Sequence, residues 1–169
     1  MELYLVPITR HNWEEAIALK VLPAQDQFVA SNLYSLAQAK AEPEWNCRGI
    51  VVEESFRQFV KAVCGRRSYD YKIRKRESTD TRKRVSWRRR RMVGFIMDGH
   101  QVLGEKFDGY WICRFMLAAD YQGKGFGRMA MKALLEDVRR CGYHQVYISF
   151  VPENAAAKGL YTSFGFADT

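Results

Sequence analysis

The sequence predicts one α/β or α+β domain over residues 1–169, with helices flanking a mixed β-sheet. Three observations lead to this fold class. Residues 110–163 follow the order strand, glycine-rich turn, helix, strand, helix. The 169 residues are 47% hydrophobic and 14% aromatic, which suits a single core. No apolar run approaches the roughly 18 residues that cross a bilayer, and the N-terminus lacks signal-peptide features, so a cytoplasmic protein without membrane contact is expected.

The first half of the chain is expected to contain one strand and three helices. A strand is predicted over 4–8, and the next helix begins near residues 9–12 and ends at Pro23. A second helix is predicted over 28–39. Residues 50–64 carry apolar side chains at helical spacing, which predicts an amphipathic third helix. Its apolar stripe consists of Val52, Phe56, Phe59, Val60 and Val63.

The second half of the chain is expected to supply most of the sheet. Strands are predicted over 92–97, 110–117 and 145–151, and helices over 128–140 and 155–163. The pair Asp98-Gly99 is a turn signal after the first of these strands, and Gly142 stands where a helix C-cap belongs. Because a helix joins the strands at 110–117 and 145–151, these two strands are expected to pair in parallel.

Positive charge is concentrated in residues 65–91, here called the basic segment. It holds thirteen Lys or Arg and three acids, so its net charge is +10. The whole chain has a net charge of +8, so the remaining residues carry −2. Few core-forming residues occur in it, and charge at this density is typical of a solvated loop or edge hairpin. Tyr69, Tyr71 and Trp87 interleave with the basic residues, so a nucleic-acid-binding module is an alternative function.

The metal-binding residue types are scattered along the chain. The four cysteines and three histidines are Cys47, Cys64, Cys113, Cys141, His11, His100 and His144. None of them forms a paired metal-ligand motif, so reduced thiols and no metal site are predicted.

A glycine-rich turn between a strand and a helix carries the first chemical signal. It reads Gln122-Gly123-Lys124-Gly125-Phe126-Gly127-Arg128. Glycines allow a tight turn whose amide N–H groups face a ligand, and a helix start adds unpaired N–H groups and a positive dipole end. Such a turn suits a pyrophosphate. An ordinary strand-to-helix connection would look similar, and neither the dinucleotide fingerprint nor the P-loop pattern fits.

A second signal begins at Asn154. This residue is a good helix N-cap, and its amide can also bond a ligand along the helix start. Tyr161 follows two helical turns later on nearly the same face. Taken alone, a helical tyrosine beside Leu160 and Phe164 is more often part of a core than catalytic.

Together, the two motifs resemble those of the GNAT family of N-acetyltransferases, closely over residues 92–166 and loosely over 1–45. The strand Phe115-Met116-Leu117 and Gln122-x-x-Gly125-x-Gly127 are similar to the family's acetyl-coenzyme A signature. The resemblance implies an acyl-CoA N-acyltransferase fold with a mostly antiparallel mixed sheet, acetyl-coenzyme A as co-substrate, and an amine acceptor. Homodimers, common among relatives, are a further expectation.

The resemblance also implies roles for individual residues. The backbone of Phe115, Met116 and Leu117 would pair with the pantetheine arm. The pyrophosphate would be held by the turn, which consists of Gln122, Gly123, Lys124, Gly125, Phe126, Gly127 and Arg128. Asn154 and Lys158 complete the cofactor-binding set. Tyr161 would donate a proton to the departing thiolate, because a phenol with a pKa near 10 is protonated at neutral pH.

The acceptor and the general base are less well defined by the sequence. Within the family, the residues of these motifs are most similar to those of diamine and polyamine acetyltransferases, such as the enzymes that act on spermidine or spermine. Glu42 and Glu44 fall where such enzymes build the acceptor site, although solvated loop acids are an equal reading. Glu44 or His100 is considered as the base that deprotonates the amine.

Two features depart from the family pattern. A helix and the basic segment are expected to intervene at about 50–91, where relatives have a short strand and a turn. Their origin as a natural insertion, a sequence error or a graft is left open. The family's final strand is also expected to be missing after Gly165-Phe166. A catalytically inactive, acetyl-coenzyme A-binding relative is therefore a second alternative.

Overall fold

The structure is a computed structural model that describes residues 2–55, 88–103 and 107–168. In chain order its elements are β1 (Glu2–Pro7), α1 (Trp13–Ala18), η1 (Pro23–Phe28), α2 (Asn32–Ala41), β2 (Asn46–Ser55), β3 (Arg88–Leu103), β4 (Phe107–Leu117), η2 (Ala119–Tyr121), α4 (Phe126–Arg140), β5 (Val146–Ile148) and α5 (Ala155–Thr162). The elements η1 and η2 are short 3₁₀ helices.

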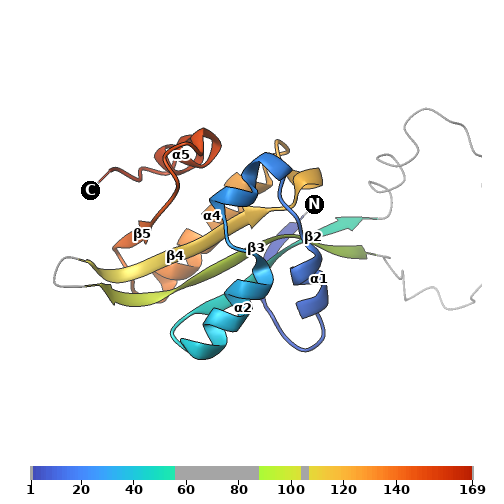
Figure 1. The fold of residues 1–169 in the computed structure, drawn as a ribbon, viewed down its shortest axis with the longest axis horizontal. Coiled ribbons are helices and arrows are strands. Elements are labelled where there is room, and N and C mark those ends of the chain that lie inside the picture. The colour runs from blue at the N-terminus through green and yellow to red at the C-terminus, as the bar shows by residue number, and fades with distance from the viewer. Residues whose placement is uncertain (1, 56–87, 104–106, 169) are drawn as a thin grey trace, which may run out of the picture.

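The strands form one five-stranded sheet in the order β1-β2-β3-β4-β5 (Figure 1). The first three strand pairs are antiparallel, and β4 pairs with β5 in parallel. The parallel pair is joined through α4, as a parallel connection requires a crossover. This confirms the predicted mixed, mostly antiparallel sheet and its one parallel pair.

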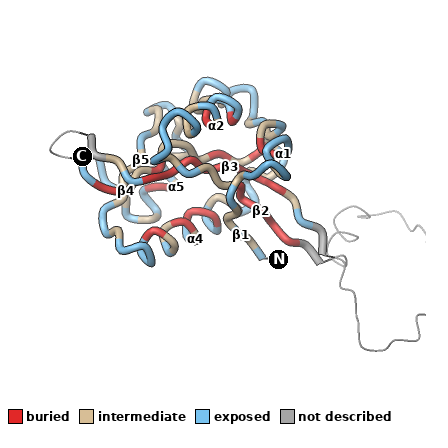
Figure 2. The backbone as a smooth tube through the Cα atoms, turned by 90° about the horizontal axis from the view of Figure 1, so that it is seen from below, coloured by how far each residue is buried: buried red, intermediate tan, exposed pale blue. Residues whose placement is uncertain are grey.

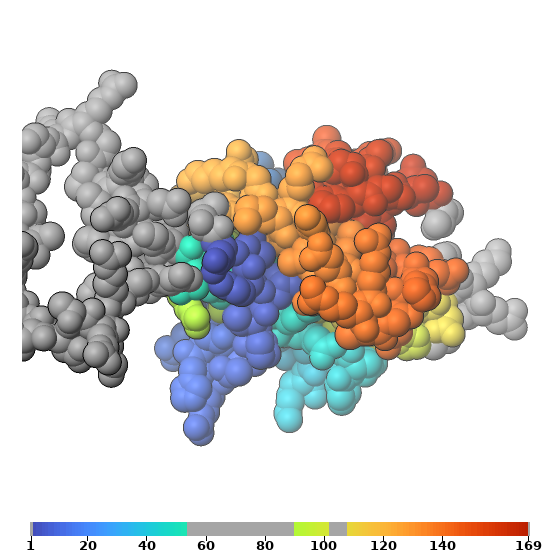
Figure 3. Space-filling model, turned by 180° about the vertical axis from the view of Figure 1, so that it is seen from behind, coloured from blue at the N-terminus to red at the C-terminus, as the bar shows by residue number. Residues whose placement is uncertain are grey.

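Helices cover both faces of the sheet. In Figure 2, α1 and α2 lie on one side and α4 lies on the other. The core has a cluster on each side: one contains Leu134 and Val138 of α4, and the other contains Ala16 of α1. Figure 3 shows the α4 face, where α4 runs between β1 and α5. Both sides of the central strands are therefore buried.

The helix predicted over 50–64 is wrong for residues 50–55, which belong to β2. Ile50, Val51 and Val52 are all buried, with Ile50 and Val52 in the α4-side cluster and Val51 in the other. A strand buried on both faces is a continuous apolar run rather than an alternating one, and β-branched residues favour it. Residues 56–64 lie outside the described part of the chain.

The turn predicted at Asp98-Gly99 is also wrong, because both residues lie inside β3. The Asp98 side chain is completely buried and accepts hydrogen bonds from both Arg48 and Tyr110. A Cβ on Gly99 would lie 2.2 Å from the backbone oxygen of Glu44, so close backbone approach explains this glycine. In this strand Asp98 is a buried hydrogen-bond acceptor, and Gly99 allows the backbone of Glu44 to come close.

The atypical region predicted at about 50–91 is narrower in the structure. Residues 88–91 start β3 and pair with 52–55 of β2, so the two strands continue the sheet on either side of 56–87. Most of the basic segment, residues 65–87, lies outside the described residues. Residues 163–168 after α5 contain no strand. Within the described ranges, no helix is long and apolar enough to cross a membrane.

Candidate functional site: the opening between β4 and β5

A cavity lies where β4 and β5 separate. The two strands pair only between 110–112 and 146–148, whereas β4 continues to Leu117. Past this point, residues 113–117 border a cavity of about 520 Å³ whose opposite wall includes 149–151 and α5. β3 occupies the other edge of this part of β4. The separation therefore leaves a strand edge facing a hollow, and an extended ligand can pair with such an edge.

The glycine-rich turn closes one end of the cavity, where Gln122, Gly123 and Gly127 contribute to the lining. Gly123 and Gly125 have φ values of +69° and +83°, which side chains with a Cβ rarely adopt. Gly125 is the N-cap of α4, and no side chain caps this helix start. The first turn of a long helix therefore presents unpaired N–H groups and a positive dipole end beside the cavity.

The Gln122 side chain fastens this turn to two other elements. Its Nε2 donates to the backbone oxygen of Leu117 at 2.9 Å and to Oε1 of Gln25 at 2.8 Å. Gln25 in η1 returns a bond of 3.0 Å from its Nε2 to Gln122 Oε1. The side-chain amide of Gln122 already has protein partners for its NH₂ group and its oxygen. Its contribution to the cavity is therefore to hold the glycine-rich turn in place.

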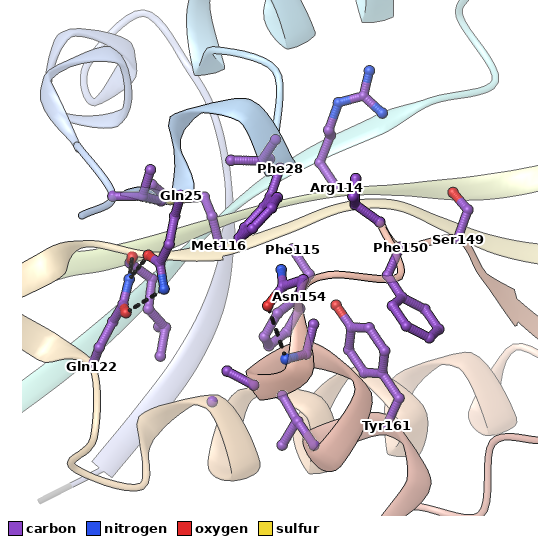
Figure 4. A pocket seen from close by; sticks show the side chains of 18 of the residues that line it. Gln25, Phe28, Arg114, Phe115, Met116, Gln122, Ser149, Phe150, Asn154 and Tyr161 are labelled. Atoms are coloured by element: carbon purple, nitrogen blue, oxygen red, sulfur yellow. Dashed lines mark hydrogen bonds between the residues drawn. The ribbon is translucent and has the colours of Figure 1, made fainter. Parts of the chain in front are cut away.

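Tyr161 stands on the α5 side of the opening. Its side chain is 6% exposed, lines the cavity, and directs its hydroxyl toward β4 (Figure 4). The ring packs edge-on against Phe150 and Phe166. Burial raises the pKa of Tyr161 to about 12, because a phenolate is poorly solvated there. The hydroxyl is therefore protonated at neutral pH and able to donate.

Asn154 has a structural bond as well as a place in the cavity. Its side-chain Oδ1 accepts a hydrogen bond of 3.1 Å from the backbone N–H of Ala157, which caps α5 as the sequence predicted. The side-chain NH₂ group has no hydrogen-bond partner among the described residues. This group is available to a ligand at the middle of the cavity, where Figure 4 places Asn154.

The predicted cofactor-binding residues divide into two sets. The structure brings eight residues with predicted roles to the cavity: Phe115, Met116, Leu117, Gln122, Gly123, Gly127, Asn154 and Tyr161. The remaining five lie outside the described lining: Lys124, Gly125, Phe126, Arg128 and Lys158. Arg128 lies over the Phe164 ring, and Lys158 is 3.9 Å from Asp168, so both cations contact the segment that follows α5. Their roles stay predictions.

The residues considered for the acceptor and the base lie elsewhere. Glu42 accepts hydrogen bonds from Gln38 and from the Trp45 indole at 2.8 Å, and neither Glu42 nor Glu44 is part of the described cavity lining. His100 Nε2 lies 2.8 Å from a carboxylate oxygen of Asp108. Within the described chain, no group of three or more His, Cys, Asp or Glu side chains could hold a metal.

Sequence reasoning missed one wall of the cavity. This wall consists of Val21, Gln25, Phe28, Val29 and Ala30. The sequence showed only a helix stop at Pro23 and a helix start near residue 28. The contact of Gln25 with Gln122 joins residues 97 positions apart, and no local pattern encodes such a pairing. Ser149, Phe150 and Val151 on the opposite wall were read as part of a strand rather than as lining residues.

Comparison with known proteins shows the family of this chain. The model of the Acetyltransferase (GNAT) family matches residues 62–166, so this chain belongs to that family. An L-methionine sulfoximine/L-methionine sulfone acetyltransferase of Salmonella typhimurium is 29% identical over 54% of this chain and 63% of its own length. A spermine/spermidine N(1)-acetyltransferase of Bacillus subtilis is 34% identical over 44% and 52%, respectively.

Solved structures show the same fold at low sequence identity. An apo aminoglycoside 6'-N-acetyltransferase from Acinetobacter haemolyticus superimposes with a TM-score of 0.56 at 10% identity, covering 100% of this chain and 92% of that one. At this identity the likeness concerns the fold alone. The match to this chain spans 63% of the length of the Salmonella typhimurium relative and 52% of the length of the Bacillus subtilis relative.

Proposed function

We propose that this chain transfers an acetyl group from acetyl-coenzyme A to the primary amine of a small molecule. The observation that carries the proposal is the cavity itself, in which an open β4 edge leads from the uncapped start of α4 to the Tyr161 hydroxyl. The start of α4 is an anion site that fits the pyrophosphate, and the β4 edge fits the pantetheine arm. The Tyr161 hydroxyl at the far end is a proton donor that fits the thioester sulfur.

In this arrangement the turn and the β4 edge hold and orient the co-substrate. The backbone groups of residues 115–117 pair with the amides of the pantetheine arm, and the N–H groups around Gly123 bind the pyrophosphate. The side-chain NH₂ of Asn154 donates to the arm near the acetyl group. Orientation of two bound reactants supplies a large part of the acceleration.

The chemical step is direct attack of the amine on the thioester. The amine nitrogen forms a bond to the acetyl carbon, the carbon–sulfur bond breaks, and the sulfur takes the Tyr161 proton, which the phenolate then regains from water. The nitrogen loses its own proton to water, because the described lining contains no Asp, Glu or His. A thiol with a pKa near 8.5 leaves more readily when a neighbouring phenol can protonate it.

Two acceptor classes are candidates. A diamine or polyamine is the acceptor that the motif wording predicts, and the Bacillus subtilis relative carries that activity in its name. An amino acid is the second candidate, because the described lining holds one cation, Arg114, and no carboxylate. A polycation is attracted by acids, so this lining favours the second class.

The alternatives from the sequence are also testable. Nucleic-acid binding rests on the basic segment, of which residues 65–87 lie outside the described part. Residues 88–91 are strand residues paired with β2. Such binding would weaken steeply with added salt. An inactive relative would bind acetyl-coenzyme A without turnover, and a homodimer stays a prediction from the family.

The direct test is thiol release from acetyl-coenzyme A by the purified chain with a panel of primary amines, with mass spectrometry of the product. We expect thiol release to match amide formation one to one. Tertiary amines of similar size are the matched control, because they form no stable amide. Thiol release that is the same with primary amines, with tertiary amines and without any amine would contradict a transferase.

A further inference from the structure

A single cation lines the end of the described cavity that lies away from the glycine-rich turn. Figure 4 places Gln122 at one end and Arg114 with Ser149 at the other. Arg114 is the one charged residue in the described lining. Burial raises the pKa of the Cys113 thiol, the charge of Arg114 opposes this rise, and Glu42 adds to it. Glu42 is not part of the described lining, and its carboxylate accepts hydrogen bonds from Trp45 and Gln38. This end of the cavity is therefore cationic.

A β-bulge sets the direction of the Arg114 side chain. Arg114 lies opposite Met97 of β3, whereas the next position along β3, Asp98, lies opposite Ile112. Cys113 is thus an extra residue in β4, and bulges re-aim side chains beside functional sites. Arg114 consequently projects from β4 away from Tyr161, toward the side of the sheet that α2 covers (Figure 4).

The guanidinium is held in place but not neutralised. Its Nη1 donates to the backbone oxygen of Cys113 at 2.9 Å and to the Cys113 sulfur at 2.8 Å. The Nε–H is buried and has no hydrogen-bond partner. None of the ion pairs among the described residues includes Arg114. A guanidinium that is fixed through Nη1 and has no acidic partner among the described residues, at the wall of a cavity, suits a planar anion.

We infer that Arg114 binds a carboxylate of the acceptor, so that the acceptor is an amino acid rather than a polyamine. This inference rests on the proposed transferase activity and names its substrate class. Tyr161 and Arg114 lie on opposite sides of the opening, so an acceptor anchored at Arg114 brings its amine to the acetyl group from the α2 side. A guanidinium attracts a carboxylate and repels an additional ammonium group.

The test compares L-amino acids with the amines that differ from them only by loss of the carboxylate, with spermidine as the polycation. Acetyl-coenzyme A binding is measured first by calorimetry, followed by kcat/KM for every acceptor. We expect the amino acids to exceed their matched amines by roughly 10- to 100-fold, the usual effect of hydrogen bonds to a charged group. Arg114→Gln should remove this preference, mainly through a higher acceptor KM, and Arg114→Lys should restore part of it.

Arg140→Gln is the matched control, because it removes the same charge at the exposed end of α4, outside the described cavity lining. It should leave the preference unchanged. Equal or better use of spermidine and the matched amines, or a preference unaltered in Arg114→Gln, would overturn the inference while leaving a working transferase. Loss of the preference in Arg140→Gln as well would also overturn it. Failure to bind acetyl-coenzyme A would instead overturn the proposed function itself.

Discussion

The two ends of the cavity are built from different chemical groups. At the α4 end, the groups that face a ligand belong to the backbone, and glycines hold them in position. At the other end, the lining includes the side chains of Tyr161 and Arg114, which we propose as the proton donor and the anion-binding cation. A backbone site tolerates many side-chain changes but not a change of φ, whereas a side-chain site depends on single functional groups. This contrast leads to distinct effects of mutation at each end.

The largest effect is expected for Tyr161→Phe. Loss of the hydroxyl removes the proton donor, so kcat should fall by about 10²- to 10⁴-fold. The ring contacts with Phe150 and Phe166 persist, so the affinity for acetyl-coenzyme A should change little. Steady-state kinetics and calorimetry measure the two quantities. Tyr34→Phe on the exposed face of α2 is the control, and a kcat within threefold of the parent in Tyr161→Phe would refute the assigned role.

At the backbone-built end, Gly125→Ala should weaken acetyl-coenzyme A binding by roughly tenfold or more. A Cβ at φ +83° is strained by about 1–2 kcal/mol, and relief of this strain moves the N–H groups at the start of α4. Gly142→Ala provides a closely matched control, because its φ is +88° and neither glycine has atoms within 4 Å of an added Cβ. Both variants should lose similar stability in urea, but only Gly125→Ala should raise the Kd.

A smaller effect is expected where the turn is joined to η1. Gln25→Ala and Gln122→Ala each break the reciprocal amide bonds, and a double-mutant cycle should show a coupling of about 1 kcal/mol in the free energy of unfolding. Gln27→Ala, in the same 3₁₀ helix, should show no coupling with Gln122→Ala. Additive effects of Gln25→Ala and Gln122→Ala would mean that the two segments are not energetically linked.

The smallest effect is expected from the ionisation of Tyr161. Its protonated form is the active one, and a pKa raised to about 12 keeps that form dominant throughout the usual assay range. The rate constant kcat should therefore rise with pH as the amine deprotonates, without a descending limb below about pH 11. A descending limb near pH 9 that is absent in Tyr161→Phe would contradict the buried, high-pKa phenol.

Local sequence patterns captured the parts of the site that depend on backbone geometry. Gly123, Gly125 and the N-cap at Asn154 mark the turn and both helix starts, because few residue types satisfy these positions. Local patterns predicted a helix instead of a strand at 50–55, because three consecutive buried residues there do not show the alternation of apolar and polar residues that is typical of a strand. Periodicity alone does not separate a strand buried on both faces from a buried helical turn.

The positions of Gln25 and Arg114 were harder to predict because they depend on tertiary contacts. Gln25 reaches the cavity through a bond to a residue 97 positions away. The bulge at Cys113, which sets the direction of Arg114, appears only in the register between β3 and β4. The resemblance offers Glu42 as an acceptor residue or as a solvated loop acid; its carboxylate accepts hydrogen bonds from Trp45 and Gln38, and its acceptor role stays a prediction. Charge in a loop does not reveal the direction of a side chain.

Acetyl-coenzyme A binding by calorimetry tests the central claim most directly, because every role described above depends on that ligand in the opening between β4 and β5. The account predicts saturable binding to one site per chain, weakened in Gly125→Ala and retained in Tyr161→Phe and Gly142→Ala. Absence of binding, or equal loss in Gly125→Ala and Gly142→Ala, would contradict the assignment of this cavity as the co-substrate site.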